Sequence, residues 1–299
     1  MSTGTDTATP PQAPAARRGP QPERGPRADC AADSAGGITF DVRLPAPLPS
    51  AAASPDHGAG LLLRSRSGDP DGPETVRLPL APVAGDPGTL RAALPSTVRL
   101  AEGRWNVFLA LDGAPPRRLL PGVNDLRSLM DRVPHADRTW LGVYIPYATK
   151  NGNLSVRSWQ RWPHAEAGEL RVVDGGLVLR GRLYGAGVAP GARLEAWARR
   201  HPDGPPVVVE AVAEGTGFTA ELPYPPLAAH PVWDLWLRPG GSAEPVRVAR
   251  ILDDIADKKR IFTYPAERVR PASGDGPDVT VTPYYTLSND LAVRVDAQD

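Results

Sequence analysis

The 299-residue sequence has one cysteine, no net charge and no long apolar run, and each absence narrows the class of protein. Cys30 alone cannot form an internal disulfide or a cysteine-rich metal site. The 34 basic and 34 acidic residues balance, which gives no support to nucleic-acid binding or to adhesion on an anionic membrane. No segment approaches the ~18 apolar residues that span a bilayer, so no membrane insertion is expected. No basic-then-apolar leader is present, so the expected location is cytoplasmic.

The signatures of the common enzyme classes are also missing. The sequence contains no G-x-S-x-G elbow, no P-loop, no G-x-G-x-x-G after a strand and no H-E-x-x-H. The five histidines are scattered, mostly beside proline or glycine, which favours exposed loop side chains over metal ligands. We therefore expect no catalytic residue, no metal and no cofactor, and the sequence favours a non-enzymatic protein.

Acidic pairs occur, but each has a structural interpretation. Asp69 and Asp71 lie in a Pro-Asp-Gly turn, where the carboxylate bonds its own backbone. Asp253 and Asp254 open a segment, residues 250–260, that ends in Lys and Arg, the charge order of a short helix. A paired-carboxylate acid/base site is the alternative for these two residues, although no substrate pocket is predicted around them.

The 36 prolines argue against long helices, because an interior proline costs about 3 kcal/mol there. Short segments with alternating apolar residues predict strands instead, beginning at 37–44. Residues 1–36 have scarcely any large apolar side chain, so we expect a disordered tail. Residues 121–133 are expected to form a short helix or a long loop.

One strand-turn-strand pattern occurs twice, as PYATKNGNLSVR at 146–157 and PYYTLSNDLAVR at 283–294. Six positions are identical, where about one would be expected by chance in so short a window. In the first copy the turn is Lys150-Asn151-Gly152-Asn153, and Asn-Gly is the strongest short signal for a hairpin.

Other blocks recur in the same order, so the chain is predicted to be all-β with two tandem domains. The segment RWNVFL near Trp105 matches VWDLWL near Trp233, and TLRAALP matches FTAELP. Units of this size with seven or eight short strands favour antiparallel β-sandwiches of immunoglobulin-like topology, although a jelly roll or open barrel stays open. The predicted boundaries are 37–159 for the first sandwich, 160–174 for a connector, with or without a small strand, and 175–296 for the second sandwich.

The tryptophans fall into two groups. Four lie within predicted strands and are expected in the core: Trp105, Trp197, Trp233 and Trp236. Trp159 and Trp162 lie where a strand gives way to the connector, near arginine and tyrosine side chains. Sugar C–H faces stack on such exposed rings, so these two tryptophans are candidates for glycan binding. The alternative, which we favour, is a hydrophobic plug between the two domains.

The repeated Tyr, Thr and Arg of the hairpins also have two interpretations. They are structural clamps that satisfy buried carbonyl groups, which we favour, or they mark one ligand site in each unit. The candidate ligand-binding residues are Tyr147, Arg157, Trp159, Trp162, Tyr284 and Arg294.

The hairpin segments TKNGNLSVR and TLSNDLAVR, each after a β-rich stretch, resemble the non-catalytic β-sandwich modules of teichoic-acid-type glycosyltransferases and glycerophosphotransferases. Modules of that family flank a catalytic domain and aid polymer binding or subunit assembly. The bias toward Ala, Arg, Pro and Gly is typical of actinobacterial chains, which often carry a transferase label. The catalytic nucleotide-sugar domain has no counterpart here, so the resemblance transfers no catalytic residue.

The leading hypothesis is a non-enzymatic accessory protein of a cell-envelope transferase system. It would bind a glycopolymer, or a glycosyl- or glycerophosphotransferase partner, through its duplicated β modules. One alternative is a glycosyl or glycerophosphoryl transferase with its site between the two domains. Another is a pure structural scaffold.

Overall fold

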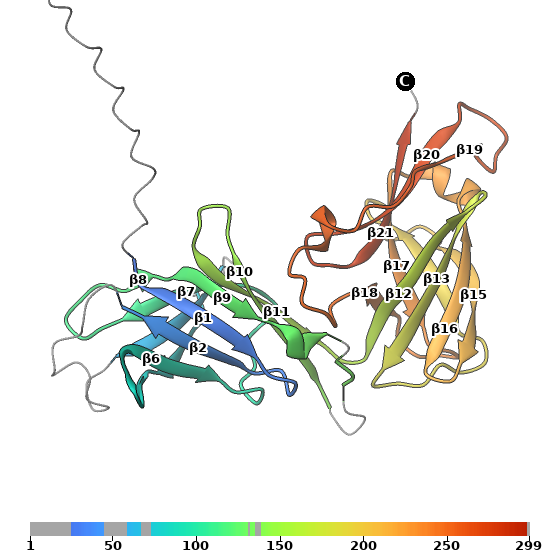
Figure 1. The fold of residues 1–299 in the computed structure, drawn as a ribbon. Coiled ribbons are helices and arrows are strands. Elements are labelled where there is room, and N and C mark those ends of the chain that lie inside the picture. Colours follow the sequence, from blue (N-terminus) through green and yellow to red (C-terminus); the bar gives the residue numbers. More distant parts are fainter. Residues whose placement is uncertain (1–24, 45–58, 67–72, 131, 135–138, 298–299) are drawn as a thin grey trace, which may run out of the picture.

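The computed structural model describes residues 25–44, 59–66, 73–130, 132–134 and 139–297, and it is all-β apart from three short 3-10 turns in these residues (Figure 1). The strands up to Arg161, coloured blue to green, gather in one half of the molecule, and those from His164 onward, coloured yellow to red, in the other. We call these the first half and the second half. Among the described residues, no helix is long and apolar enough to cross a membrane.

The first half consists of two sheets. One has the order β5-β6-β2-β1-β9, with β5 (Ala81–Val83), β6 (Asp86–Leu94), β2 (Ile38–Arg43), β1 (Arg27–Ala32) and β9 (Leu120–Asp125). The other has the order β10-β11-β7-β3-β4, with β10 (Leu141–Ala148), β11 (Leu154–Arg161), β7 (Gly103–Ala110), β3 (Gly60–Ser65) and β4 (Thr75–Pro79). The two-residue strand β8 (Arg117–Arg118) pairs with β7.

The second half contains a closed ring of seven strands. In order around the ring, these are β14 (Arg193–Ala198), β15 (Val207–Glu214), β16 (Gly217–Pro223), β13 (Gly176–Tyr184), β12 (His164–Val173), β18 (Val246–Ala249) and β17 (Val232–Arg238), which pairs back with β14. Three strands extend outward from β17, in the order β21 (Leu291–Ala297), β20 (Val279–Tyr285) and β19 (Glu267–Val269). The expectation of two immunoglobulin-like sandwiches is therefore wrong for this half.

Proline explains why one half closes and the other does not. In the second half β15 carries no proline and is continuous, so its first residues pair with β14 and its last with β16. The corresponding chain of the first half is broken between β4, which ends at Pro79, and β5, which contains Pro82. Proline has no N–H group to donate to a strand ladder. This segment therefore forms two separate strands, β4 in one sheet and β5 in the other.

Despite this difference, the strand pairings of the two halves correspond residue by residue. Strand β11 pairs with β7 and sets Val156 opposite Trp105, as β21 pairs with β17 and sets Val293 opposite Trp233. Strands β1 and β12 each pair antiparallel with the following strand and parallel with a later one. The matched sequence blocks therefore occupy matched positions in the structure.

The two copies of the repeated hairpin, β10–β11 and β20–β21, share one turn geometry. The Thr149 amide donates to the Asn153 carbonyl at 2.9 Å, and the Thr286 amide donates to the Asp290 carbonyl at 2.9 Å. The left-handed position is Gly152 (φ 72°) in one turn and Asn289 (φ 60°) in the other. Glycine and asparagine tolerate this conformation best, so the Asn-Gly prediction of a hairpin at 146–157 is confirmed.

Three segments differ from expectation. Strand β1 lies within residues 1–36, so disorder does not hold for this strand, whose small Ala28 and Cys30 are buried in the core; residues 1–24 lie outside the described part of the chain. Residues 160–174, the expected connector, contain β12 of the seven-stranded ring. Residues 121–133, expected to be a short helix or a long loop, contain the end of β9 (Leu120–Asp125) and the 3-10 turn Arg127–Leu129, and residues 250–260 contain the 3-10 turn Lys258–Arg260.

Each half has its own hydrophobic core, and a third buried cluster joins them. This cluster combines residues of the first half, among them Val143, Ile145 and Trp159, with Ala249 and Ile251 of the second. Apolar burial contributes about 25 cal/mol per Å², so a shared core of this kind holds the two halves in contact.

Candidate functional site

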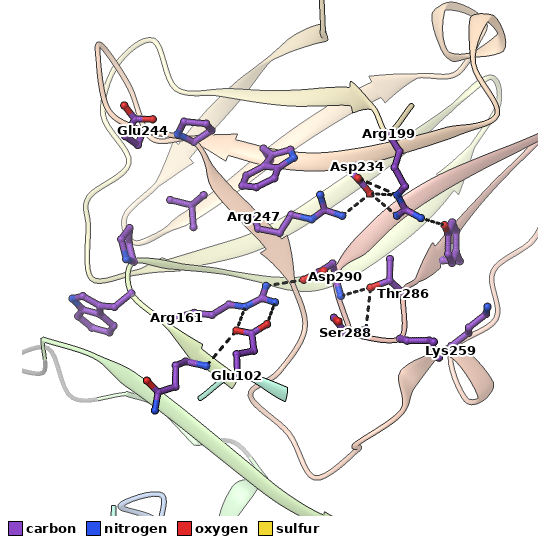
Figure 2. A pocket seen from close by; sticks show the side chains of 18 residues that line it. Glu102, Arg161, Arg199, Asp234, Glu244, Arg247, Lys259, Thr286, Ser288 and Asp290 are labelled. Atoms are coloured by element: carbon purple, nitrogen blue, oxygen red, sulfur yellow. Dashed lines mark hydrogen bonds and ion pairs between the residues drawn. The ribbon is translucent and has the colours of Figure 1, made fainter. Parts of the chain in front are cut away.

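A cleft of about 950 Å³ lies where the two halves meet (Figure 2). The first half contributes Glu102 and Arg161, and Trp162 follows at the start of the crossing to the second half. The second half contributes Arg199, Asp234, Trp236, Arg247, Tyr284 and the turn 286–290. The cleft therefore combines charged groups with three aromatic rings.

The alternation of β17 determines which of its side chains face this cleft. Trp233, Leu235 and Leu237 point into the core, whereas Asp234 and Trp236 point outward. On the neighbouring strand β14, Trp197 also lies on the outer face and is half-buried. The expected core position is confirmed for Trp105 and Trp233 but is wrong for Trp197 and Trp236, because the period-two alternation of a strand sends every second side chain outward.

Asp234 is the centre of the charged network. Its Oδ1 accepts hydrogen bonds from Arg199 at 2.6 Å and from Arg247 at 2.5 Å, and Arg199 also reaches the Tyr284 hydroxyl at 3.4 Å. Burial opposes ionisation of this carboxyl, but the hydrogen bonds from Arg199 and Arg247 outweigh it, so the pKa of Asp234 lies below its ordinary value. The Arg247 guanidinium also lies 5.0 Å from the centre of the Trp236 ring.

A second carboxylate is buried on the same outer face. Glu195 is 2% exposed and accepts hydrogen bonds from Arg193 at 2.9 Å, from Arg238 at 2.5 Å and from the Trp197 indole at 3.0 Å. Burial alone would raise the pKa of Glu195, but the bonds from Arg238, Arg193 and Trp197 lower it overall. These bonds hold Arg193 of β14 and Arg238 of β17 on one carboxylate.

Arg161 forms ion pairs with carboxylates on both walls of the cleft. It donates to Glu102 of the first half at 2.8 Å and to Asp290 of the second half at 2.7 Å. Burial opposes the charged form, but the bonds to these carboxylates outweigh it and the pKa of Arg161 is raised. Because two carboxylates satisfy this guanidinium, it is held in one orientation at the base of the cleft.

The cleft carries no formal net charge. Four cationic side chains line it, Arg161, Arg199, Arg247 and Lys259, and four acidic ones, Glu102, Asp234, Glu244 and Asp290. Four minus four leaves zero, so the cleft offers hydrogen-bond donors and acceptors together. This arrangement suits a ligand rich in hydroxyl groups better than an ion.

The six candidate residues do not form one site. Trp162 and Tyr284 line this cleft, whereas Tyr147 lines a second cleft of about 780 Å³ on another side of the contact between the halves. Arg157 and Trp159 are buried between the halves. Arg294 is exposed, pairs with Asp296 at 2.7 Å and belongs to neither cleft.

Trp159 and Arg157 both contact the turn of the second hairpin. The Trp159 indole donates to the Ser288 carbonyl at 2.8 Å, and the Arg157 guanidinium donates to the Ser288 hydroxyl at 3.1 Å. Trp159 is fully buried in the cluster that joins the halves, which is the position of a hydrophobic plug. Trp162 is half-buried, and its ring packs over Gly185, where an added Cβ would lie 2.3 Å from it.

Sequence reasoning missed the residues at the centre of the cleft, Arg161, Arg199, Asp234, Trp236 and Arg247. One signal was available in VWDLWL, because the strict alternation predicts that Asp234 and Trp236 share the face opposite Trp233. Arg199 and Arg247 come from two different strand regions, and only strand pairing brings both of them to the Asp234 carboxylate.

Histidine and aspartate side chains form no metal centre in the described part of the chain, where no group of three His, Cys, Asp or Glu could hold an ion. His164 is buried in β12 and lies 2.6 Å from Glu166, so the exposed-loop interpretation is wrong for it. Asp253 pairs with the buried Lys258 at 2.6 Å. His57, His135, Asp69 and Asp71 lie outside the described residues.

The sequence matches no known family and no curated protein. Among solved structures, a crystal structure of S. aureus TarS residues 217–571 is similar with a TM-score of 0.30 and 15% identity, covering 66% of this chain and 55% of that one. A second S. aureus TarS structure gives a TM-score of 0.29 and 14% identity, over 66% of this chain and 35% of that one. The chain thus spans about half or less of these proteins, and the likeness is too distant to support an argument about function.

Proposed function

We propose that this protein is a non-catalytic glycan-binding module whose ligand lies in the cleft between its two halves. The observation that carries the proposal is the set of aromatic rings around the Arg199–Asp234–Arg247 network. Trp236, Trp162 and Tyr284 supply ring surface for the C–H faces of sugars, and the network supplies donors and acceptors for their hydroxyl groups.

The rigidity of the cleft supports this proposal. Asp234 is held by two arginines and Arg161 by two carboxylates, so neither group needs to reorganise when a ligand arrives. Preorganised polar groups reduce the free-energy cost of ordering a site on binding. A weak, broad specificity for neutral oligosaccharides follows from a charge-balanced, open cleft.

Isothermal titration with a panel of neutral and amino-sugar oligosaccharides tests the proposal. Trp236→Ala should weaken binding of the best ligand by about tenfold, since tenfold corresponds to roughly 1.4 kcal/mol, the scale of one ring contact. Trp140→Ala is the matched control, because Trp140 is also half-buried, stacks with Arg99 at 4.9 Å and lies outside the cleft. Equal affinities in both variants, or no binding by the wild-type protein, would sink the proposal.

The finer form of the proposal is that the module serves a cell-envelope transferase, either by presenting a glycopolymer or by contacting a glycosyl- or glycerophosphotransferase. It is motivated by the resemblance of the hairpin segments to modules of such enzymes. A tagged pull-down from the native host, read by mass spectrometry, should recover such an enzyme with the wild-type chain. If no such transferase is recovered, the role in a transferase system is rejected and direct glycan binding is left as the proposal.

A transferase with its site in the same cleft is the competing function. It predicts that a nucleotide-sugar or CDP-alcohol raises the melting temperature in proportion to the logarithm of its concentration above the Kd. A panel without a shift counts against it. A pure scaffold predicts no ligand in either experiment.

A further inference from the structure

The network around Asp234 has a counterpart in the first half, in which one residue is changed. Strand β14 pairs with β17 as β3 pairs with β7, and Leu194 opposite Leu237 corresponds to Leu61 opposite Leu109. Counting along these strands places Asn106 where the second half has Asp234. An amide therefore takes the place of the carboxylate.

Similar side chains surround Asn106 in the first half and Asp234 in the second half. Phe108 corresponds to Trp236, and the arginine opposite each ring, Arg118 or Arg247, lies 5.0 Å from the ring centre in both halves. Arg66 corresponds to Arg199, since their amides bond the carbonyl groups of the matched residues 104 and 232. Tyr147 corresponds to Tyr284 at the same position of the repeated hairpin.

The change from aspartate to asparagine removes the carboxylate that both arginines would share. In the second half Asp234 accepts from Arg199 and Arg247. In the first half, neither Arg66 nor Arg118 forms an ion pair within the described residues. Arg66 and Arg118 thus share no carboxylate, unlike their counterparts Arg199 and Arg247.

Arg118 contacts β11 but no carboxylate among the described residues. Its Nη2 donates to the Leu154 carbonyl at 3.1 Å and to the Ser155 hydroxyl at 3.4 Å. Its buried Nε, like that of the matched Arg247, has no hydrogen-bond partner among the described residues. Burial and the nearby charge of Arg66 lower the pKa of Arg118, whereas the bond to Asp234 raises the pKa of Arg199. Arg199 of the second half is therefore stabilised as a cation, whereas Arg118, the counterpart of Arg247, is not.

The surroundings add further positive charge. Arg104 and Arg157 lie opposite one another on β7 and β11 of the same sheet, and the charge of Arg104 helps to lower the pKa of Arg157, after burial. Arg66, Arg104, Tyr147 and Lys150 line the second cleft, so a ligand has access from solvent. Asp254 and Asp257 line its other wall, where Asp257 lies 3.7 Å from Arg260.

We infer that Arg66, Arg118 and Tyr147 bind an exogenous oxyanion, a carboxylate or phosphate group, beside the Asn106 amide, which stands where the second half has the Asp234 carboxylate. Planar guanidinium groups match the two oxygens of such a group, and the tyrosine hydroxyl can donate to a third. The second cleft thus selects an anionic ligand, whereas the cleft around Asp234 carries no formal net charge. The inference is independent of glycan binding there.

Asn106→Asp tests this inference, because it supplies the missing carboxylate from within the chain. The probes are sodium phosphate and sodium acetate, titrated against sodium chloride of equal ionic strength, with the melting temperature and isothermal titration as readouts. We expect both anions to stabilise the wild-type protein beyond chloride, and Asn106→Asp to melt higher without anion and to lose their effect. Arg66→Ala, at an exposed position, should weaken phosphate binding by about tenfold.

Two controls separate this site from general charge effects. Arg64→Ala removes an arginine that stacks on the same Phe108 ring at 5.1 Å but has no counterpart among the Asp234 ligands, and it should leave anion binding within about twofold. Glucuronate against glucose then distinguishes a sugar acid from a free ion. Equal anion shifts in wild type and Asn106→Asp, or no shift beyond chloride in the wild type, would overturn the inference.

Discussion

The indole nitrogen of Trp159 donates a 2.8 Å hydrogen bond to the carbonyl oxygen of Ser288, and this bond joins the two halves of the molecule. Trp159 lies on β11, two residues beyond the first copy of the repeated segment, and Ser288 lies in the turn of the second copy. Asn289 of the same turn is fixed within the second half, because its side-chain oxygen accepts a hydrogen bond from the Lys258 amide at 3.2 Å. The turn of the second hairpin therefore bonds both to β11 of the first half and to the segment at Lys258 of the second half.

Replacement of Trp159 should destabilise this contact. Trp159→Phe loses mainly the hydrogen bond, at about 1 kcal/mol. Trp159→Ala also leaves a cavity and should cost about 3–5 kcal/mol. Urea unfolding followed by far-UV circular dichroism checks both values. If Trp159→Ala unfolds at the wild-type midpoint, the tryptophan does not carry the contact assigned to it.

Removal of the Asp234 carboxylate should change the acid stability. The pKa of Asp234 is lower in the folded state than in the unfolded chain, where it is about 3.9. Its stabilisation is therefore complete above about pH 4 and is lost as the pH falls through the lowered folded value. Asp234→Asn removes this contribution and leaves Arg199 and Arg247 without the negative charge that they share.

The measurement is the midpoint of urea unfolding between pH 2 and pH 7 for wild type and Asp234→Asn. The difference in stability should be largest at pH 7 and shrink toward pH 2. Asp296→Asn is a suitable control, because Asp296 pairs with Arg294 at the surface and is exposed. A gap between wild type and Asp234→Asn that stays constant across this range would contradict the assignment.

Cys30 should be unreactive in the folded protein. Burial, followed by the negative charges of Asp29 and Asp41, raises the pKa of its thiol to about 12. At pH 8 nearly all of this thiol is protonated, and only the thiolate reacts. Ellman's reagent should label it rapidly in 6 M guanidinium chloride and at least a hundredfold more slowly without denaturant, in proportion to the open population. Equal rates would show that β1 is not packed as described.

Local sequence features predicted local structure well. The Asn-Gly pair in residues 146–157 and the six repeated positions predicted two matching hairpins, and the alternation around Trp105 and Trp233 predicted their buried faces. The short β1 was missed because its core residues, Ala28 and Cys30, are small and its pattern is weak. Strand formation there depends on pairing with β2 and β9 rather than on its own side chains.

The sites were harder to predict than the strands. Trp162 and Tyr284 were singled out and lie in one cleft, but Arg157 and Trp159 were grouped with them although they are buried beneath the turn. Proximity in sequence cannot separate the two faces of a hairpin from the contact that covers one of them. The aligned blocks RWNVFL and VWDLWL show Asn106 where the second half has Asp234. The effect of this difference on charge depends on the arginines nearby, which the aligned blocks do not show.

The sequence by itself determined the all-β class, the repeated hairpin and its left-handed turn position, because these depend on alternation and on the backbone freedom of glycine and asparagine. Tertiary structure alone decided that the second half closes into a ring, that Asn289 in the second turn is buried while Gly152 in the first is exposed, and that two arginines of one half share a carboxylate. These outcomes depend on contacts between residues far apart in the chain. The energy of such contacts is set by register and packing, which no short segment encodes.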